Sequence, residues 1–269
     1  MTVLLTGSSG LVGQLLVERL PALGIELRTL DRRAPQDGPA PDVLADITDN
    51  AAVRDAMAGV DALVHLAGQP TEAPWPVIRS ANLDGLVTVY EAARAAGVRR
   101  IVYASSNHAV GFTEHPSDGE LPADTPPRPD TLYGVSKVFG EALSRYHHDR
   151  YGVEVACLRI GTCRPEPDSS RALATWLSPD DCAALVAACL NTPDLGFRLI
   201  WGVSANRHRW FSLAAGEDIG FRPGDDGASV RPDLEVADRT ELDARVGGEF
   251  TGTAFGLDEI ADQFRDRTR

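Results

Sequence analysis

The N-terminal stretch constrains the fold of this chain more than any other part of the sequence. Val3 to Thr6 is a short apolar run that predicts a β-strand, and Leu15, Leu16 and Leu20 follow at helical spacing. Between them lies Gly7-Ser-Ser-Gly10-Leu-Val-Gly13, where glycine permits a tight turn, close approach of a phosphate and close helix–strand packing. The backbone N–H groups and the positive end of the helix favour a pyrophosphate. The stretch therefore predicts a dinucleotide-binding β–α unit, although the motif by itself also fits a plain β–α turn.

Strands and helices alternate along the rest of the chain. A 3.6-residue apolar stripe over 82–96 predicts a long helix, and Ser178 with Pro179 and two acids predicts a helix start that leads to about Asn191. This alternation predicts a Rossmann-like, doubly wound α/β fold with a parallel sheet. Further strands are expected at 25–30, 43–45, 61–68 and 101–106, with loops at 34–42 and 116–130.

We expect one domain over residues 1–269. Its NAD-binding core should occupy about 1–160, and a small C-terminal part at about 161–269 should carry substrate-binding elements. Residues 207–255 are polar and glycine-rich and show few motifs, and 256–267 has the pattern of a closing amphipathic helix.

Composition and charge exclude several classes of function. The net charge is −13, which argues against nucleic acid and against an anionic membrane surface as partners. An anionic small substrate would therefore need a local arginine. The four cysteines have no Cys-x-x-Cys spacing and do not cluster with the six histidines, so we expect reduced, buried thiols and no metal site. Met1 leads straight into a strand and no long apolar run follows, so we expect a cytoplasmic protein.

An acidic residue lies at the position that distinguishes NAD from NADP. Asp31 follows the second predicted strand, 24 residues after Gly7, where a carboxylate grips the adenosine ribose. A carboxylate there repels a 2′-phosphate and favours NAD, whereas the following Arg32 and Arg33 could favour NADP. We expect NAD, with Asp46 and Ile47 after the third strand positioned to meet the adenine.

Tyr133 and Lys137 have the spacing of an acid–base pair on one helix face. A tyrosine phenol titrates near pH 10, and a neighbouring ammonium favours its phenolate. A shift of three units corresponds to about 4 kcal/mol, which two charges about 4 Å apart supply at an effective dielectric of about 20. The pair would need partial burial, because most such spacings only decorate the surface of a helix.

Small and hydroxyl-bearing residues occupy the carboxyl ends of two predicted strands, the edge where ligands bind in a parallel sheet. Ala67 and Gly68 end the fourth strand and let the backbone pass close to the cofactor, and Ser105 and Ser106 end the fifth. His65, within the fourth strand, is expected to be a hydrogen-bonded core histidine rather than a ligand.

Together these pieces resemble the extended short-chain dehydrogenases/reductases over most of residues 1–205. The motifs are the glycine-rich turn, Asp31, Asp46, His65-Leu-Ala-Gly68, Asn82, Ser105-Ser106, Tyr133-x-x-x-Lys137 and Leu158-Arg159. The resemblance implies a catalytic unit of Ser106, Tyr133 and Lys137, with Ser106 chosen because it lies five residues before Gly111. It also implies a homo-oligomer and cofactor contacts at Gly7, Ser9, Gly10, Leu11, Val12, Gly13, Asp31, Asp46, Ile47, Leu66, Ala67, Gly68, Asn82, Tyr133, Lys137 and Ile160.

A narrower resemblance points to uronate dehydrogenases, which oxidise C1 of galacturonate or glucuronate with NAD to an aldaric acid lactone. It rests on the stretches 104–112, 159–167, 171–176 and 201–206. It implies a sugar acid substrate held by Ser106, Asn107, His108, Tyr133, Thr162 and Arg171. After Gly68, however, those enzymes have a small apolar residue and a serine that touches the sugar, whereas this chain has Gln69-Pro70. Thr71 is the nearest hydroxyl, and we expect it to contact the substrate.

Several alternatives stay open at the level of sequence. Asn107 and His108 could instead cap a strand end, Arg171 could be a surface residue, and Asn82 could be a structural amide. An epimerase or dehydratase acting on another sugar or nucleotide sugar uses the same scaffold, but dehydratases tend to carry Asp-Glu where this chain has Asn107-His108. A non-catalytic NAD-sensing regulator would often lack Tyr133 or Lys137, and both are present.

Overall fold

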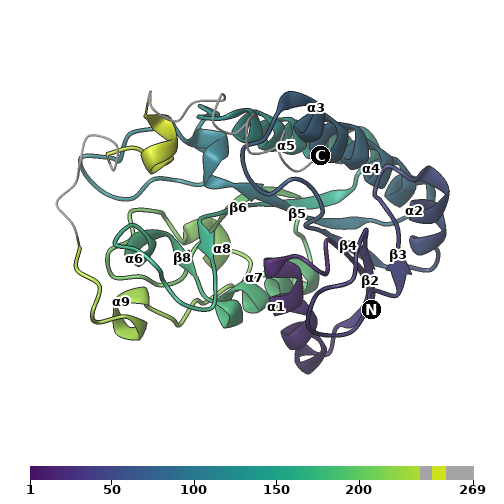
Figure 1. Ribbon diagram of the computed structural model, residues 1–269, viewed down its shortest axis with the longest axis horizontal. Coiled ribbons are helices and arrows are strands. Elements are labelled where there is room, and N and C mark those ends of the chain that lie inside the picture. The colour runs from purple at the N-terminus through teal and green to yellow at the C-terminus, as the bar shows by residue number, and fades with distance from the viewer. Residues whose placement is uncertain (237–243, 253–269) are drawn as a thin grey trace.

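A seven-stranded parallel sheet forms the centre of the protein in the computed structural model, which describes residues 1–236 and 244–252 (Figure 1). Its strand order is β3-β2-β1-β4-β5-β6-β9. The chain winds outward from β1 to β3 and then crosses to β4 on the other side of β1, which places a ligand-binding crevice at the carboxyl ends of the central strands. The strands are β1 (Thr2–Thr6), β2 (Glu26–Asp31), β3 (Val43–Leu44), β4 (Ala62–His65), β5 (Arg100–Ser106), β6 (Glu154–Ile160) and β9 (Phe197–Gly202), and a separate pair joins β7 (Thr162–Cys163) to β8 (Trp176–Leu177).

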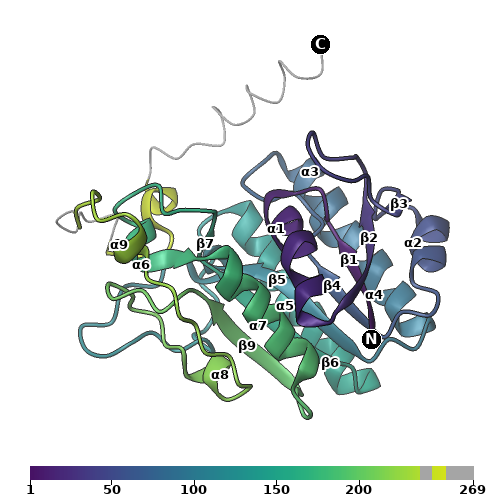
Figure 2. The same ribbon diagram turned by 90° about the horizontal axis from the view of Figure 1, so that it is seen from below.

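Helices cover both faces of the sheet (Figures 1 and 2). Successive side chains of β1 enter different cores: Val3 and Leu5 pack on one face, and Leu4 packs on the other. The doubly wound α/β fold is therefore confirmed. Helices α1 (Leu11–Arg19) and α7 (Pro179–Asn191) cover the first face, and α2 (Asn50–Ala56), α4 (Gly85–Ala95) and α5 (Leu132–Tyr151) cover the second.

The predicted start of α7 is confirmed, whereas that of the helix at 82–96 was too late. The Ser178 hydroxyl accepts a hydrogen bond of 2.9 Å from the N–H of Asp181, as expected of an N-cap. The other helix is continuous from α3 (Trp75–Ile78) through a π-helical stretch, η2 (Arg79–Asp84), into α4. Pro74 and Pro76 flank its first residue, and proline in a first turn loses no helical hydrogen bond. The apolar stripe marked only the buried second half.

Short elements build a smaller part beside β9, and they have their own core. Trp201 and Val203 at the end of β9 pack with Trp210, Phe211 and Val246. Since β9 is a strand of the main sheet and α7 covers one face of it, residues after 160 contribute to both parts. The predicted helix at 256–267 lies outside the described residues. The remaining short helices are η1 (Leu20–Leu23), η3 (Asn107–Val110), α6 (Ala172–Thr175), α8 (Ala214–Glu217), α9 (Gly227–Val230) and η4 (Gly248–Thr251).

Over residues 1–236 and 244–252, no helix combines the length and the apolar character needed to cross a bilayer.

A buried ion pair joins α5 to the ends of β5 and β6. Arg159 on β6 binds Glu141 on α5 through two hydrogen bonds, of 2.9 and 2.8 Å, and its third nitrogen donates to the carbonyls of Ala123 and Thr125. The Ser105 hydroxyl donates to the same carboxylate at 2.6 Å. Each nitrogen of Arg159 is thus bound to an acceptor, which helps to satisfy the buried charge. The network thus holds α5 in a fixed position relative to the ends of β5 and β6.

Replacing Glu141 with glutamine should destabilise the protein strongly, because it leaves the buried charge of Arg159 without a counterion. Breaking one partner of such a pair costs roughly 3–5 kcal/mol. Urea unfolding followed by circular dichroism measures this loss. Asp149→Asn is the matched control on the same helix, since its pair with Arg145 is more than half exposed and should contribute little. Equal unfolding midpoints for the two variants would contradict the role given to Glu141.

Candidate active site

The glycine-rich turn lies directly against the exit of β4. Gly7 has φ +79°, and a Cβ at this position would lie 2.6 Å from the backbone nitrogen of Ala67. A Cβ on Gly13 would lie 2.1 Å from the carbonyl oxygen of Gly7. Both glycines are therefore required by close approach of backbone to backbone, which also brings Leu66 and Ala67 beside the turn.

The turn has the features that a dinucleotide phosphate needs. Helix α1 begins at Leu11 with no side-chain cap on its first N–H groups, and Val12 follows in the same turn. The Ser8 hydroxyl is buried and has no partner within the described residues. Asp31 accepts a hydrogen bond of 3.0 Å from the N–H of Ser9, so the end of β2 adjoins the turn. These residues fit a pyrophosphate at the turn and a ribose at Asp31.

Other predicted cofactor residues line the same edge or support it. Asp46 follows β3, and the hydrogen bond from the Thr48 N–H lowers the pKa of its carboxyl. Ile47 is buried against Gly85, and Ile160 ends β6. Asn82 is buried and serves as a clamp, because its amide binds both the N–H and the carbonyl of Gln69, at 2.6 and 3.1 Å. The same amide donates to the hydroxyl of Ser136 on α5, so it holds the loop after Gly68 against that helix.

Ser106, Tyr133 and Lys137 meet where α5 passes the end of β5. The Thr131 hydroxyl caps the helix, and the buried Glu72 carboxylate accepts a 2.7 Å hydrogen bond from the N–H of Tyr133. The Ser106 hydroxyl is a hydrogen-bond partner of the Tyr133 phenol. Lys137 Nζ donates to the carbonyl of Ala104 at 2.7 Å and lies 5.3 Å from the centroid of the Tyr133 ring. Ser105 points instead to Glu141, which supports Ser106 as the serine of the unit.

The expected effect of Lys137 on Tyr133 was wrong for the protein by itself. Burial raises the pKa of Tyr133 to about 12, with the negative charge of Asp130 adding to the rise and the Ser106 hydrogen bond opposing it. Burial also lowers the pKa of Lys137 to about 8, partly offset by Glu141. The attraction between the two charges, which the spacing predicts, is outweighed by the hydration that each group loses on burial. Lys137 remains protonated at neutral pH.

Two of the predicted substrate residues bind a carbonyl that is distant in sequence. The Asn107 amide and the Arg171 guanidinium both donate to the carbonyl of Val246. The His108 ring packs edge-on against that of Tyr133, with centroids 5.8 Å apart. Thr162 shares a hydrogen bond of 2.9 Å with Thr175, which ties it to the helix that follows Arg171. Asn107 thus has a structural role as well as a place near the phenol.

Thr71 is the weakest of the predicted substrate contacts. Thr71 is exposed in the loop after β4, and the adjacent Glu72 is the residue that accepts a hydrogen bond from α5.

The segment over residues 244–252 forms a side of the site that sequence reasoning missed. Val246 is fully buried, and the Phe250 ring lies 4.6 Å from that of His108. A Cβ on Gly248 would lie 3.1 Å from Nη1 of Arg171. The only signal in the sequence was the short run Val246-Gly247-Gly248, which permits close approach of the backbone. Glu72 and Asp130 were also missed, because nothing local marks them.

His65 and the cysteines behave as expected of core residues. His65 shares a 2.7 Å hydrogen bond with the Thr6 hydroxyl, and burial lowers its pKa to about 3. The four cysteines are buried and free.

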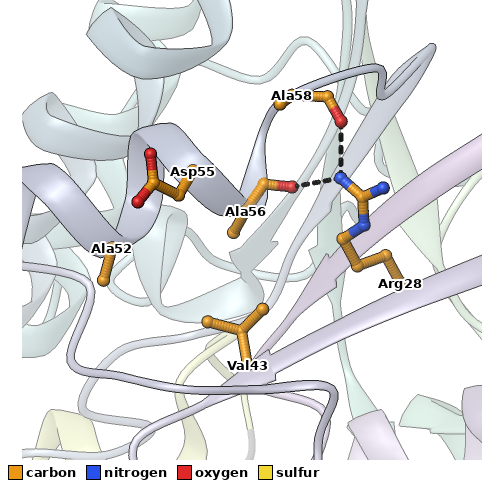
Figure 3. Close-up of a pocket in the computed structure, with 6 residues that line it drawn as sticks. All are labelled: Arg28, Val43, Ala52, Asp55, Ala56 and Ala58. Atoms are coloured by element: carbon orange, nitrogen blue, oxygen red, sulfur yellow. Dashed lines mark hydrogen bonds between the residues drawn. The ribbon is translucent and has the colours of Figure 1, made fainter.

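A surface hollow between β2, β3 and α2 lies away from this edge (Figure 3). The guanidinium of Arg28 in it is bound to the carbonyls of Ala56 and Ala58, at 2.8 and 2.6 Å. Most of its other lining side chains are alanine or valine, so the hollow offers few groups that could bind a polar ligand or react with one. The lining residues are Arg28, Val43, Ala52, Asp55, Ala56 and Ala58.

Comparison with known proteins agrees with this geometry. The NAD dependent epimerase/dehydratase family matches residues 3–194. A uronate dehydrogenase of Agrobacterium fabrum is 43% identical over 231 residues, which cover 85% of this chain and 86% of that protein. An NAD-dependent glucose-6-phosphate dehydrogenase of Haloferax volcanii is 38% identical over 258 residues, 88% of this chain and 98% of that protein.

Solved structures give the same result. A mutant of the uronate dehydrogenase from Agrobacterium tumefaciens, complexed with NAD, superposes with a TM-score of 0.84 at 40% identity, covering 93% of this chain and 96% of that one. The family match spans the glycine-rich turn, Ser106, Tyr133 and Lys137 together. The chain therefore belongs to the NAD dependent epimerase/dehydratase family, the extended short-chain dehydrogenases/reductases, and is an NAD-dependent oxidoreductase.

Proposed function

We propose that this protein oxidises a hexuronate, galacturonate or glucuronate, at C1 and releases an aldaric acid lactone. The observation that carries the proposal is the meeting of Tyr133, Ser106 and Lys137 with His108 and Arg171 at one sheet edge. Tyr133, Ser106 and Lys137 supply an acid–base unit. Arg171 supplies a local positive charge in a protein whose net charge is negative. The similarity to uronate dehydrogenases over most of the chain supports the choice of substrate.

The glycine-rich turn, Asp31, Asp46 and the exit of β4 would hold NAD. When bound, NAD accepts the hydride from C1 of the sugar. Tyr133 and Lys137 would contact its nicotinamide half, and Asp31 would bind its adenosine ribose. The carboxylate of Asp31 disfavours a 2′-phosphate, which supports NAD over NADP.

Tyr133 acts as the general base on the anomeric hydroxyl. The phenolate takes the hydroxyl proton while C1 loses its hydrogen with two electrons, and the C1–O bond becomes the lactone carbonyl. Ser106 donates to the C1 oxygen and keeps it in line. Because the pKa of Tyr133 is about 12 in the protein alone, the positive charge of the oxidised cofactor has to join that of Lys137 to bring the phenol toward neutrality.

Arg171 binds the carboxylate of the substrate. A guanidinium offers a planar fork that matches a carboxylate with two hydrogen bonds. Its contacts with Val246 and Gly248 hold the side chain beside Asn107, which also binds the carbonyl of Val246. The same fork could accept a sugar phosphate, so the substrate panel has to include one.

Turnover with a panel of sugars tests the proposal. Purified protein with NAD should produce NADH absorbance with galacturonate or glucuronate, and much less with glucose, glucose 6-phosphate or UDP-glucose. The lactone is then identified by NMR. A preference for glucose 6-phosphate would reassign the substrate, and reaction with UDP-glucose alone would indicate a nucleotide-sugar enzyme instead.

Tyr133→Phe should lower kcat by roughly a hundredfold to ten-thousandfold, because the substrate proton then has no base. Tyr146→Phe is the matched control, since Tyr146 is an exposed tyrosine on the same helix. NAD affinity, measured by fluorescence quenching, should change little in either variant. Parental turnover by Tyr133→Phe would remove Tyr133 from the mechanism.

Arg171→Ala should reduce kcat/KM for the uronate at least about thirtyfold, since truncating one partner of a buried charge pair costs roughly 2–5 kcal/mol. Steady-state rates at saturating NAD measure the change. Arg164→Ala is the control, because Arg164 lies nearby in sequence but is half exposed and paired with Asp168. An unchanged kcat/KM in Arg171→Ala would exclude it as the carboxylate clamp.

A further inference from the structure

Asp130, just before α5, is a buried carboxylate directed at His108. Its side chain is fully buried, and its Oδ2 lies 2.8 Å from Nδ1 of His108. Thr131 donates a second hydrogen bond to Oδ1 at 3.0 Å. A buried carboxylate needs hydrogen-bond donors, and these two groups supply them.

Glycines leave the space that this carboxylate fills. A Cβ on either Gly111 or Gly247 would lie 1.9 Å from Oδ2 of Asp130, far closer than a Cβ can approach a heavy atom to which it is not bonded. These glycines come from segments more than a hundred residues apart in sequence. Backbone from both sides therefore encloses Asp130 and leaves it little freedom to turn away from His108.

The contact determines which nitrogen of His108 carries the proton. An ionised carboxylate only accepts hydrogen bonds, so Nδ1 must donate and therefore bears hydrogen. In the neutral ring, Nε2 then has a free lone pair. Nε2 has no hydrogen-bond partner among the described residues, and the ring is held between Tyr133 and Phe250.

The negative charge of Asp130 opposes ionisation of the Tyr133 phenol. It raises the pKa of Tyr133, so removing the charge should not make the phenol harder to ionise. A defect caused by losing Asp130 should therefore appear in substrate binding rather than in proton removal.

We propose that Asp130 is a positioning residue that fixes the Nδ1–H tautomer of His108, so that Nε2 accepts a hydrogen bond from a hydroxyl of the substrate. The substrate's identity rests on the proposed function, whereas the tautomer does not. If another sugar proves to be the substrate, the kinetic test below is performed with that sugar.

A double-mutant cycle tests whether Asp130 acts through His108. Asp130→Asn allows the amide to donate to Nδ1 and should raise KM for the sugar at least tenfold, with kcat within threefold and NAD affinity unchanged. His108→Gln should raise KM similarly, and the double variant should be no worse than His108→Gln. Asp124→Asn, an exposed residue of the same loop, is the control. Additive losses, or a fall in kcat without a rise in KM, would overturn the proposal.

Nitrogen NMR of the unmodified protein provides a test that needs neither turnover nor a folded Asp130 variant. The imidazole signals of His108 are identified by their loss in His108→Gln. In the spectrum of the neutral ring, a protonated Nδ1 and an unprotonated Nε2 are expected. A neutral ring that carries its hydrogen on Nε2 would refute the proposal whatever the substrate is.

Discussion

The ion pair between Glu141 and Arg159 sets the geometry on which the site depends. It joins α5, the helix that carries Tyr133 and Lys137, to the ends of strands β5 and β6 at the carboxyl edge of the sheet. Glu141 lies one helical turn after Lys137, so holding its carboxylate fixes the rotation of α5. Ser105 is occupied by this network, and the next residue on the strand, Ser106, is left to face the phenol. The network is thus a support that keeps the reacting groups in register.

Burial opposes ionisation of both titratable residues in the proposed catalytic unit. It raises the pKa of Tyr133 and lowers that of Lys137, so it favours the uncharged form of each. Asp130 adds to the rise at Tyr133, and Lys137 keeps its charge at neutral pH. In the proposed mechanism, a further positive charge is needed before the phenol becomes a base. That mechanism couples removal of the proton to binding of the oxidised cofactor, because each extra positive charge nearby stabilises the phenolate.

Local patterns explain what could be predicted from the sequence. The glycine-rich turn and the cap at Ser178 are short-range features whose geometry follows from neighbouring residues, and the helical spacing of Tyr133 and Lys137 likewise placed them on one face. Contacts over long sequence distances could not be predicted in this way. Val246 reaches Asn107 across more than a hundred residues, and Glu72 and Asp130 resemble ordinary surface acids until the fold buries them. The wrong expectation for Tyr133 has a different cause, since the spacing gives the attraction between the two charges but not the hydration that each loses on burial.

Ionisation of Tyr133 with and without NAD measures most directly whether the positive charge of the cofactor makes the phenol a base. The phenolate absorbance of this residue is the difference between the parent and Tyr133→Phe at the same NAD concentration, recorded across the alkaline pH range. Without NAD, no Tyr133 phenolate is expected until the pH approaches about 12. With saturating NAD, the signal should appear several pH units lower. The same titration curve in both conditions would show that the cofactor does not promote ionisation of Tyr133.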